Sequence, residues 1–193
     1  MTKTETDFPR LEQLEEELKR ERYKSRYKKV IRSTVYALIT VAAVSVLVAT
    51  LWMPVLQIYG SSMTPTLNEG QIVISVKTTD FKEGDIVAFY QGNKLLVKRY
   101  IAGPGAWVNI EGDGTVYVND QKIDEPYLKE KAYGDCNIEL PYQVPDGRIF
   151  VMGDHRSTSI DSRNTAVGGV SDEQIVGKIV FKIWPLSDFG VIN

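Results

Sequence analysis

The sequence predicts a mainly β protein: an antiparallel β-sandwich or partly closed barrel that follows one N-terminal transmembrane helix. Two observations support this prediction. No charged residue occurs from Ser33 to Asn68, and the sequence after residue 58 consists of short Val- and Ile-rich runs separated by turn residues. With 193 residues, 43% of them hydrophobic, the chain suits one domain with appendages and is not a disordered polar chain. We expect a tail over residues 1–32, a transmembrane helix over 33–57 and a β domain over 58–193.

The tail is basic and is expected to be helical. Residues 1–32 contain 10 Lys and Arg against 7 Asp and Glu, whereas the rest of the chain is acidic. Leu11, Leu14 and Leu18 recur at helical spacing, which predicts a helix over Pro9–Lys29. One short helix of mixed charge does not indicate a nucleic-acid partner, and its basic end is expected to contact anionic lipid.

The charge-free run is long enough to cross a bilayer. Val35–Leu56 has 22 residues and would extend roughly 33 Å as a helix. Because the basic residues precede it, the positive-inside rule puts the tail in the cytoplasm and the β domain outside. A cleaved signal peptide has a shorter apolar region, and a buried core helix usually has a polar side. We therefore expect a single-pass membrane protein.

Eight runs after residue 58 have the composition of β-strands. They are rich in Val, Ile and aromatic residues and are separated by Gly, Pro, Asn and Asp. Apart from a short turn at Ser171–Gln174, this region shows no helical periodicity over three turns, which favours an all-β domain. The predicted strands are Gln71–Val76, Asp85–Tyr90, Lys94–Ile101, Trp107–Ile110, Thr115–Val118, Gln121–Ile123, Arg148–Met152 and Ile175–Trp184.

Cys and His are too few for several kinds of site. The chain has one Cys and one His, which excludes an intrachain disulfide, a Cys-based zinc cluster and a multi-histidine metal site. We expect no metal and no cofactor. A Ser-His-Asp triad would have to use His155, so a different base is favoured.

Two segments supply a serine and a lysine that suit nucleophilic catalysis. Ser62 lies in a turn of small residues that begins at Gly60, and such a turn lets backbone N–H groups approach a substrate closely. On a strand over Lys94–Ile101, Lys98 and Arg99 point to opposite faces, each between large apolar side chains. Whichever face packs inward buries a cation, and of the two only Lys can then lose its proton and act as a base. The plainer alternatives are an ordinary Gly/Ser/Pro turn and a lysine that extends to solvent from an edge strand.

A polar loop after the Arg148–Met152 strand is the third candidate. Gly153–Arg163 contains two Asp, two Arg and four hydroxyl residues. Asp161 and Arg163 are expected to pair and to fix the loop, so that a hydroxyl such as that of Ser159 holds another group in position.

Four sequence blocks that follow a membrane segment resemble type I signal peptidases, the bacterial membrane-anchored Ser/Lys proteases that remove signal peptides from exported preproteins. The blocks are SMTPTL from Ser62, GDIVAF from Gly84, VKR from Val97, and the loop Gly153–Arg163 with its GD and DSR ends. Each block alone is weak evidence, but four in the family's order are specific, and they cover most of residues 55–185.

The resemblance implies a catalytic site that works through an acyl-enzyme. It implies Ser62 as the nucleophile, neutral Lys98 as the general base, a hydrogen bond between Ser159 and Lys98, and a structural ion pair between Asp161 and Arg163. The implied pockets for short residues at the −1 and −3 positions of the substrate are lined by Leu56, Ile58, Met63, Leu96 and Val97.

The resemblance also implies how this chain differs from some relatives. Where some members have a second serine that donates to the oxyanion, this chain has Gly60, as Gram-positive-type members do. The short stretch between Lys98 and Gly153 implies a reduced accessory β-domain. The implied partners are signal peptides and the lipid bilayer of a bacterial cell membrane, with the N-terminus cytoplasmic and the catalytic domain extracytoplasmic.

Two other classes of protein share some of these features. A self-cleaving Ser/Lys repressor would have a DNA-binding domain where this chain has its apolar segment. A non-catalytic membrane-anchored β-domain that binds an extracytoplasmic partner remains an alternative. The distance from Ser62 Oγ to Lys98 Nζ separates them: hydrogen-bond distance supports the enzyme, and more than about 6 Å supports the binding module.

Overall fold

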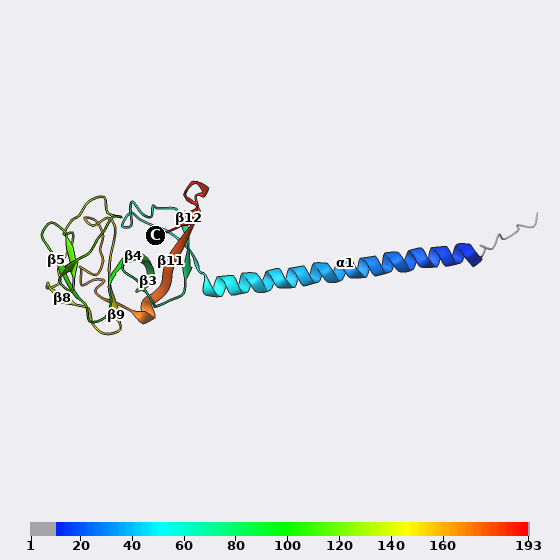
Figure 1. Ribbon diagram of the computed structural model, residues 1–193, viewed down its shortest axis with the longest axis horizontal. Coiled ribbons are helices and arrows are strands. Elements are labelled where there is room, and N and C mark those ends of the chain that lie inside the picture. Colours follow the sequence, from blue (N-terminus) through cyan, green and yellow to red (C-terminus); the bar gives the residue numbers. More distant parts are fainter. Residues whose placement is uncertain (1–10, 193) are drawn as a thin grey trace, which may run out of the picture. The chain divides into compact units, whose positions relative to one another are not determined.

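The computed structural model describes residues 11–192, and they begin with one long helix, α1 (Leu11–Trp52) (Figure 1). α1 is the only helix of the described residues that is long and apolar enough to cross a membrane, and none of its apolar window is buried. The tail helix and the transmembrane helix that we expected separately are thus one element. The expected start at Pro9 lies outside the described residues.

The helix ends earlier than the predicted boundary at residue 57. It stops at Trp52, and Val55–Gln57 form strand β1, which pairs with β2. Pro54 explains the difference, because a proline disfavours helical backbone at the preceding residue and has no N–H to donate. Ser33–Trp52 still provides 20 residues, roughly 30 Å of helix.

Residues from Thr50 onward form a compact unit of their own, separate from the unit that ends at Ala49. Its larger sheet is antiparallel throughout, with the strand order β1-β2-β11-β3-β4-β9-β10 and β12 paired to β11. Its strands are β1 (Val55–Gln57), β2 (Ile72–Val76), β3 (Ile86–Gln91), β4 (Lys94–Ala102), β9 (Arg148–Met152), β10 (Val170–Ser171), β11 (Ile175–Trp184) and β12 (Gly190–Val191).

A smaller antiparallel sheet lies at the end of this unit away from β11 and β12 (Figure 1). Its strand order is β7-β6-β5-β8. The strands are β5 (Trp107–Ile110), β6 (Val116–Val118), β7 (Gln121–Lys122) and β8 (Tyr142–Gln143). Two short 3₁₀ turns, Asp172–Gln174 and Leu186–Asp188, complete the unit.

The prediction of a mainly β domain is confirmed, and each of the eight predicted runs contains a strand. The sequence did not reveal four short strands, β1, β8, β10 and β12, which have two or three residues each. Strands of this length have no periodicity of their own and exist because a longer neighbour pairs with them. For example, Val170 and Ser171 are placed by pairing with β9.

β4 is the strand around which the interior is organised. Leu95 and Val97 pack against the cluster that contains Ile58, Met63 and Leu67, whereas Leu96 and Tyr100 pack against a second cluster that contains Val87 and Phe89. Because apolar clusters cover both faces of the strand, both of its central cations are buried: Lys98 is 3% exposed and Arg99 is 1% exposed.

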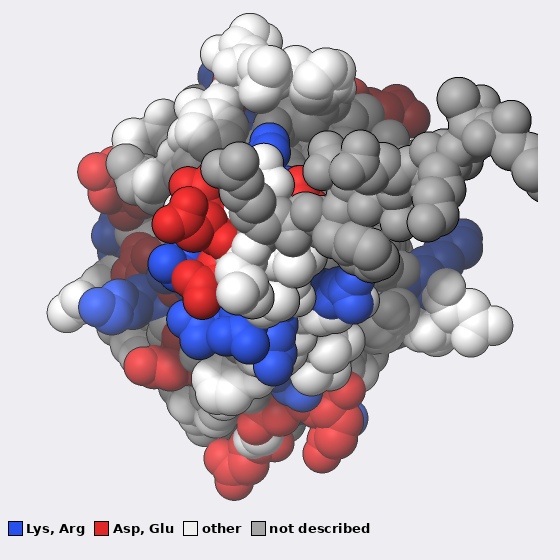
Figure 2. All heavy atoms as spheres, turned by 90° about the vertical axis from the view of Figure 1, so that its right-hand side faces the viewer, with Lys and Arg blue, Asp and Glu red and all other residues white. Residues whose placement is uncertain are grey.

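β1 and the first half of β4 each have one hydrogen-bonding edge without a partner strand in the described part of the chain. Among the described residues β1 pairs with β2 alone, and β4 pairs with β9 only from Arg99 to Ala102, which leaves one edge of Lys94–Lys98 unpaired. The face of the molecule drawn in Figure 2 shows acidic and basic side chains next to one another.

Candidate active site

Ser62 lies in the connection between β1 and β2, in a turn that is held from inside. Thr64 donates from its amide to the Ser61 carbonyl (3.1 Å), and the Leu67 amide donates to the Met63 carbonyl (2.8 Å). Met63 and Leu67 are buried in the core and anchor the turn. Gly60 begins it with a φ of +79°, in the left-handed region that glycine adopts without strain.

Lys98 Nζ is 2.6 Å from Ser62 Oγ, and the two groups are hydrogen-bonded. Burial lowers the pKa of Lys98 from 10.5 to about 8; the carboxylates of Asp161 and Asp154 oppose this shift and the Arg163 guanidinium adds to it. About one tenth of the amine is therefore neutral at pH 7, and about half is neutral at pH 8. This distance is far below the 6 Å limit, so the geometry supports an enzyme and not the binding-module alternative.

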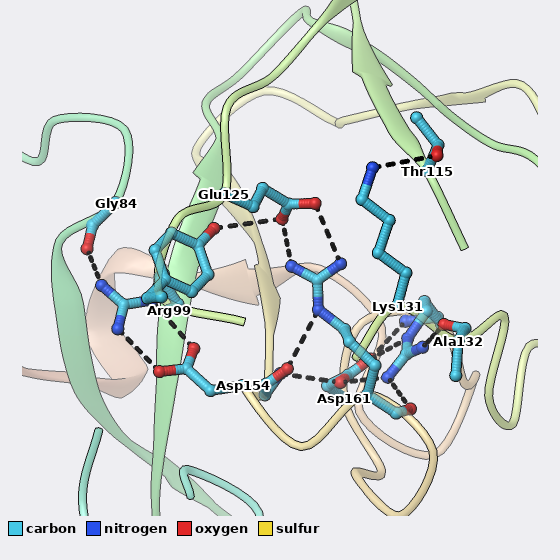
Figure 3. A network of polar contacts seen from close by, with 12 residues as sticks. Gly84, Arg99, Thr115, Glu125, Lys131, Ala132, Asp154 and Asp161 are labelled. Atoms are coloured by element: carbon cyan, nitrogen blue, oxygen red, sulfur yellow. Dashed lines mark hydrogen bonds and ion pairs between the residues drawn. The ribbon is translucent and has the colours of Figure 1, made fainter. Parts of the chain in front are cut away.

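Arg99 lies on the opposite face of β4 from Lys98, and through Asp154 it is linked to the turn that carries Ser62. Its Nε and Nη2 donate to the two Asp154 oxygens (2.8 and 2.6 Å), and its Nη1 donates to the Gly84 carbonyl (2.5 Å) (Figure 3). Thr66, four residues after Ser62, donates from its hydroxyl to Asp154 (2.5 Å). The Arg99–Asp154 pair thus connects β4 to the turn that carries Ser62.

The structure places Asp161 and Arg163 as a buried ion pair, with Arg163 Nε 2.8 Å from Asp161 Oδ1 and both side chains inaccessible to solvent. Arg163 also donates to the carbonyls of Tyr133 (2.8 Å) and Arg156 (2.9 Å). Burial alone would raise the pKa of Asp161, but the bonds and charge of Arg163 and the Gly153 amide outweigh it and hold that pKa below its usual value.

The expected hydrogen bond between Ser159 and Lys98 is wrong for this structure. Ser159 is buried, and no hydrogen bond joins its hydroxyl to Lys98, whose amine is bonded to Ser62; the hydroxyl interacts instead with Asp161 and helps to lower the pKa of that carboxyl. The reason is local packing. The Ser159 amide donates to the His155 carbonyl, and its side chain lies so close to Gly153 that a Cβ there would collide with it and with the Ser62 carbonyl oxygen.

A groove of about 560 Å³ opens beside Ser62 and Lys98. It is bounded by residues of β1, of the turn and of the unpaired part of β4. The five residues predicted for substrate pockets, Leu56, Ile58, Met63, Leu96 and Val97, all line it.

Sequence reasoning missed three residues that support this site: Glu125, Tyr127 and Arg156. Arg156 is buried and paired with Glu125, and the Tyr127 ring covers the Arg99 guanidinium. Arg156 stands in the polar loop that we singled out, but its partner is 31 residues away in the sequence. No local pattern marks Glu125 and Tyr127, which flank a proline in a segment that reads as a turn.

Comparisons with known proteins show the family to which the chain is similar. A family described as "Signal peptidase, peptidase S26" matches residues 30–184. Signal peptidase IB of Staphylococcus aureus is 40% identical over 152 residues, 68% of this chain and 78% of that protein. Signal peptidase I of Bacillus amyloliquefaciens is 33% identical over 182 residues, 89% of this chain and 97% of that protein.

Among solved structures, a signal peptidase I from Enterococcus faecalis V583 is similar over 53% of this chain and 98% of its own, with 29% identity and a TM-score of 0.45. The family match covers the end of α1 and nearly the whole β unit, including the turn, β4 and the polar loop. This chain belongs to the signal peptidase family, peptidase S26.

Proposed function

We propose that this chain is a serine endopeptidase that removes signal peptides from exported preproteins, with Ser62 as the nucleophile and neutral Lys98 as the general base. The main support for these two catalytic roles is the 2.6 Å distance between Ser62 Oγ and Lys98 Nζ. A base must lie within hydrogen-bond reach of the proton it removes, and an amine can act as one only when burial lowers its pKa.

The reaction begins when Ser62 Oγ attacks the scissile carbonyl and its proton moves to Lys98 Nζ. As the tetrahedral intermediate collapses, the peptide C–N bond breaks, the leaving amine takes that proton, and an acyl-enzyme remains on Ser62. Lys98 then removes a proton from water, whose oxygen attacks the ester. The bond between the acyl carbon and Ser62 Oγ breaks, Lys98 returns the proton to Ser62 Oγ, and the signal peptide leaves with a new carboxylate. Within the described residues the Ser62 amide donates no hydrogen bond, so it is available to the oxyanion.

The two free strand edges support an extended substrate. β1 and the Lys94–Lys98 part of β4 both border the groove, and each has an unpaired edge of N–H and C=O groups. An extended peptide can pair with such an edge while alternate side chains enter pockets. The pocket walls are the apolar Leu56, Ile58 and Leu96, which suit short apolar residues before the cleavage site.

Incubating the purified full-length protein with a signal-peptide substrate, followed by mass spectrometry of the products, tests the activity. We expect one cut between the signal peptide and the mature chain. Intact substrate after prolonged incubation with folded protein would contradict the proposal.

The pH dependence of cleavage should follow Lys98. Because the neutral amine is the active form and burial lowers its pKa to about 8, kcat/KM should rise nearly tenfold per pH unit below that value and level off above about pH 9. Initial rates between pH 6 and 9 measure this, with activity regained on return from each pH as the control for unfolding. A flat profile would exclude a lysine base.

We further propose that the β unit faces the extracytoplasmic surface of the membrane in which α1 is anchored. Val55 follows the end of α1 by three residues and is exposed, so the β unit starts within about 10 Å of chain length from the anchor. At the C-terminal side of the same sheet, large apolar side chains also remain exposed: Trp184, Leu186, Phe189 and Val191. Exposed aromatic and aliphatic groups of this kind suit a lipid surface.

Labelling of the single cysteine tests this orientation. Cys136 is half-buried in the β unit and is the only Cys in the sequence. A membrane-impermeant maleimide added to intact cells should modify it. The matched variant, with Cys136→Ser and Ser25→Cys in the exposed part of α1, should be modified only after the cells are permeabilised. Equal labelling of Ser25→Cys in intact cells would contradict the topology.

A further inference from the structure

Glu125 contacts Arg156, and Tyr127 contacts Arg99. Glu125 and Tyr127 both lie outside the four sequence blocks that carry the family resemblance. Both lie between β7 and β8, in the part of the chain that carries the smaller sheet. Figure 3 shows Glu125 between the Arg99 and Asp161 ends of one continuous polar network. The two residues contact each other, since Tyr127 Oη donates to Glu125 Oε1 (3.0 Å).

Tyr127 contacts Arg99, the residue that follows Lys98 in β4. The Arg99 guanidinium carbon lies 3.7 Å from the centre of the Tyr127 ring, a distance at which a cation is attracted to an aromatic face. Arg99 follows Lys98 directly in β4, and its in-plane donors are taken up by Asp154 and Gly84. The ring therefore closes the open face of a guanidinium that fixes the strand at Lys98.

Glu125 is connected to Ser62 through Arg156 and Gly153. It forms a buried ion pair with Arg156, whose Nε donates to the Gly153 carbonyl (3.1 Å). Gly153 packs against the Ser62 carbonyl oxygen, which accepts the His155 amide (3.0 Å). Glu125 thus fixes Arg156, and Arg156 in turn fixes the Gly153 backbone that packs against Ser62.

Glu125 also balances the charge of Arg156 within the buried polar network. Three arginines and three carboxylates form pairs here, Arg99–Asp154, Arg156–Glu125 and Arg163–Asp161, and every side chain is at most 2% exposed. Without Glu125, Arg156 would be left as a buried positive charge with no counter-ion.

We propose that Glu125 and Tyr127 are positioning residues: through Arg156 and Arg99 they fix the relative placement of Ser62 and Lys98. This inference rests on the proposed roles of Ser62 and Lys98. It attributes to the segment between β7 and β8 a part in catalysis, since a displacement of about 1 Å at the reacting groups costs on the order of 100-fold in rate.

The test uses full-length protein and four variants with a signal-peptide substrate. Glu125→Gln removes the charge and keeps the shape, and Tyr127→Leu removes the ring. Glu139→Gln and Tyr90→Phe are the matched controls, since both residues are exposed. For each variant kcat and KM are measured from pH 6 to 9 per folded enzyme, with the folded fraction taken from near-UV circular dichroism.

We expect Glu125→Gln and Tyr127→Leu to lower kcat by about tenfold or more with KM changed by less than about twofold. The rise of kcat with pH should stay in place in both variants, because the charges that act on Lys98 are those of Asp161, Arg163 and Asp154, which neither variant removes. The controls should behave as the unchanged protein.

A purely structural role would lower the folded fraction and leave kcat per folded enzyme unchanged, and that result would overturn the inference. If Glu125→Gln does not fold, Tyr127→Leu decides alone. Ser62→Ala, measured in parallel, distinguishes a wrong nucleophile from a wrong positioning role. Cleavage by Ser62→Ala would refute the proposed nucleophile, whereas inactive Ser62→Ala with unaltered kcat in both test variants would refute only the positioning role.

Discussion

Replacing Lys98 with Met is expected to abolish signal-peptide cleavage without destabilising the fold. The amine is hydrogen-bonded to Ser62 and is the only described group placed to take its proton, so kcat should fall by on the order of 10⁴ or more. Ser62→Ala should lose activity to the same extent. Product formation by mass spectrometry and thermal unfolding measure the two parts of this prediction.

The stability of Lys98→Met should depend on pH in a defined way. The pKa of Lys98 is lowered from 10.5 to about 8 in the folded protein, so below pH 8 the folded state has to bury a charged amine that the unfolded state keeps in water. This penalty is about 3 kcal/mol when fully present below pH 8, and it fades as the pH rises from 8 to 10.5. Methionine carries no such penalty.

Lys98→Met should therefore unfold no more readily than the unchanged protein at pH 7, and its advantage should disappear toward pH 10.5. Lys82→Met, at an exposed lysine before β3, is the control and should leave cleavage unchanged. Residual cleavage by Lys98→Met above one part in about a thousand, or a lower melting temperature together with full activity, would refute the assigned role.

Arg163→Met is expected to destabilise the β unit more than any substitution at its surface. Arg163 donates two hydrogen bonds to Asp161 and others to the carbonyls of Ala132, Tyr133 and Arg156. Removing it leaves Asp161 buried without its counter-ion, which costs about 3–5 kcal/mol of unfolding free energy. Urea unfolding at pH 7 measures the loss.

A half-exposed ion pair in the same unit provides the comparison. Lys178 Nζ lies 2.6 Å from Asp85 Oδ1, with the lysine side chain 31% exposed, and Lys178→Met should cost no more than about 1 kcal/mol. Because the pKa of Asp161 is held below its usual value, the contribution of its pair with Arg163 should be complete above about pH 4 and be lost as the pH falls through the lowered pKa. Equal losses in the two variants at pH 7 would contradict this account.

The sequence predicted the elements whose signals are local. The apolar run identified the long helix, and the β-branched runs identified the main strands, because both depend on residues adjacent in the chain. In β4 the alternation of Lys98 and Arg99 with large apolar residues predicted that a cation would be buried. It did not show that both cations are buried, because that depends on which strands and loops cover the second face.

The rest of the site depends on contacts between distant parts of the chain. Glu125 meets Arg156 across 31 residues, and Arg99 meets Asp154 across 55. The direction of the Ser159 hydroxyl depends on how closely its loop packs against Gly153. A one-dimensional pattern does not encode such distances. The helix end at Trp52, in contrast, was readable from Pro54.

The three buried ion pairs have a consequence for the conditions under which the enzyme works. Dissolved ions weaken the attraction between charges that water can reach, and they act far less on charges enclosed by protein. Asp154, Asp161 and Arg163, whose charges act on Lys98, are enclosed in this way. The electric potential at the amine is therefore set by the protein itself, and kcat should vary little with the salt concentration of the medium.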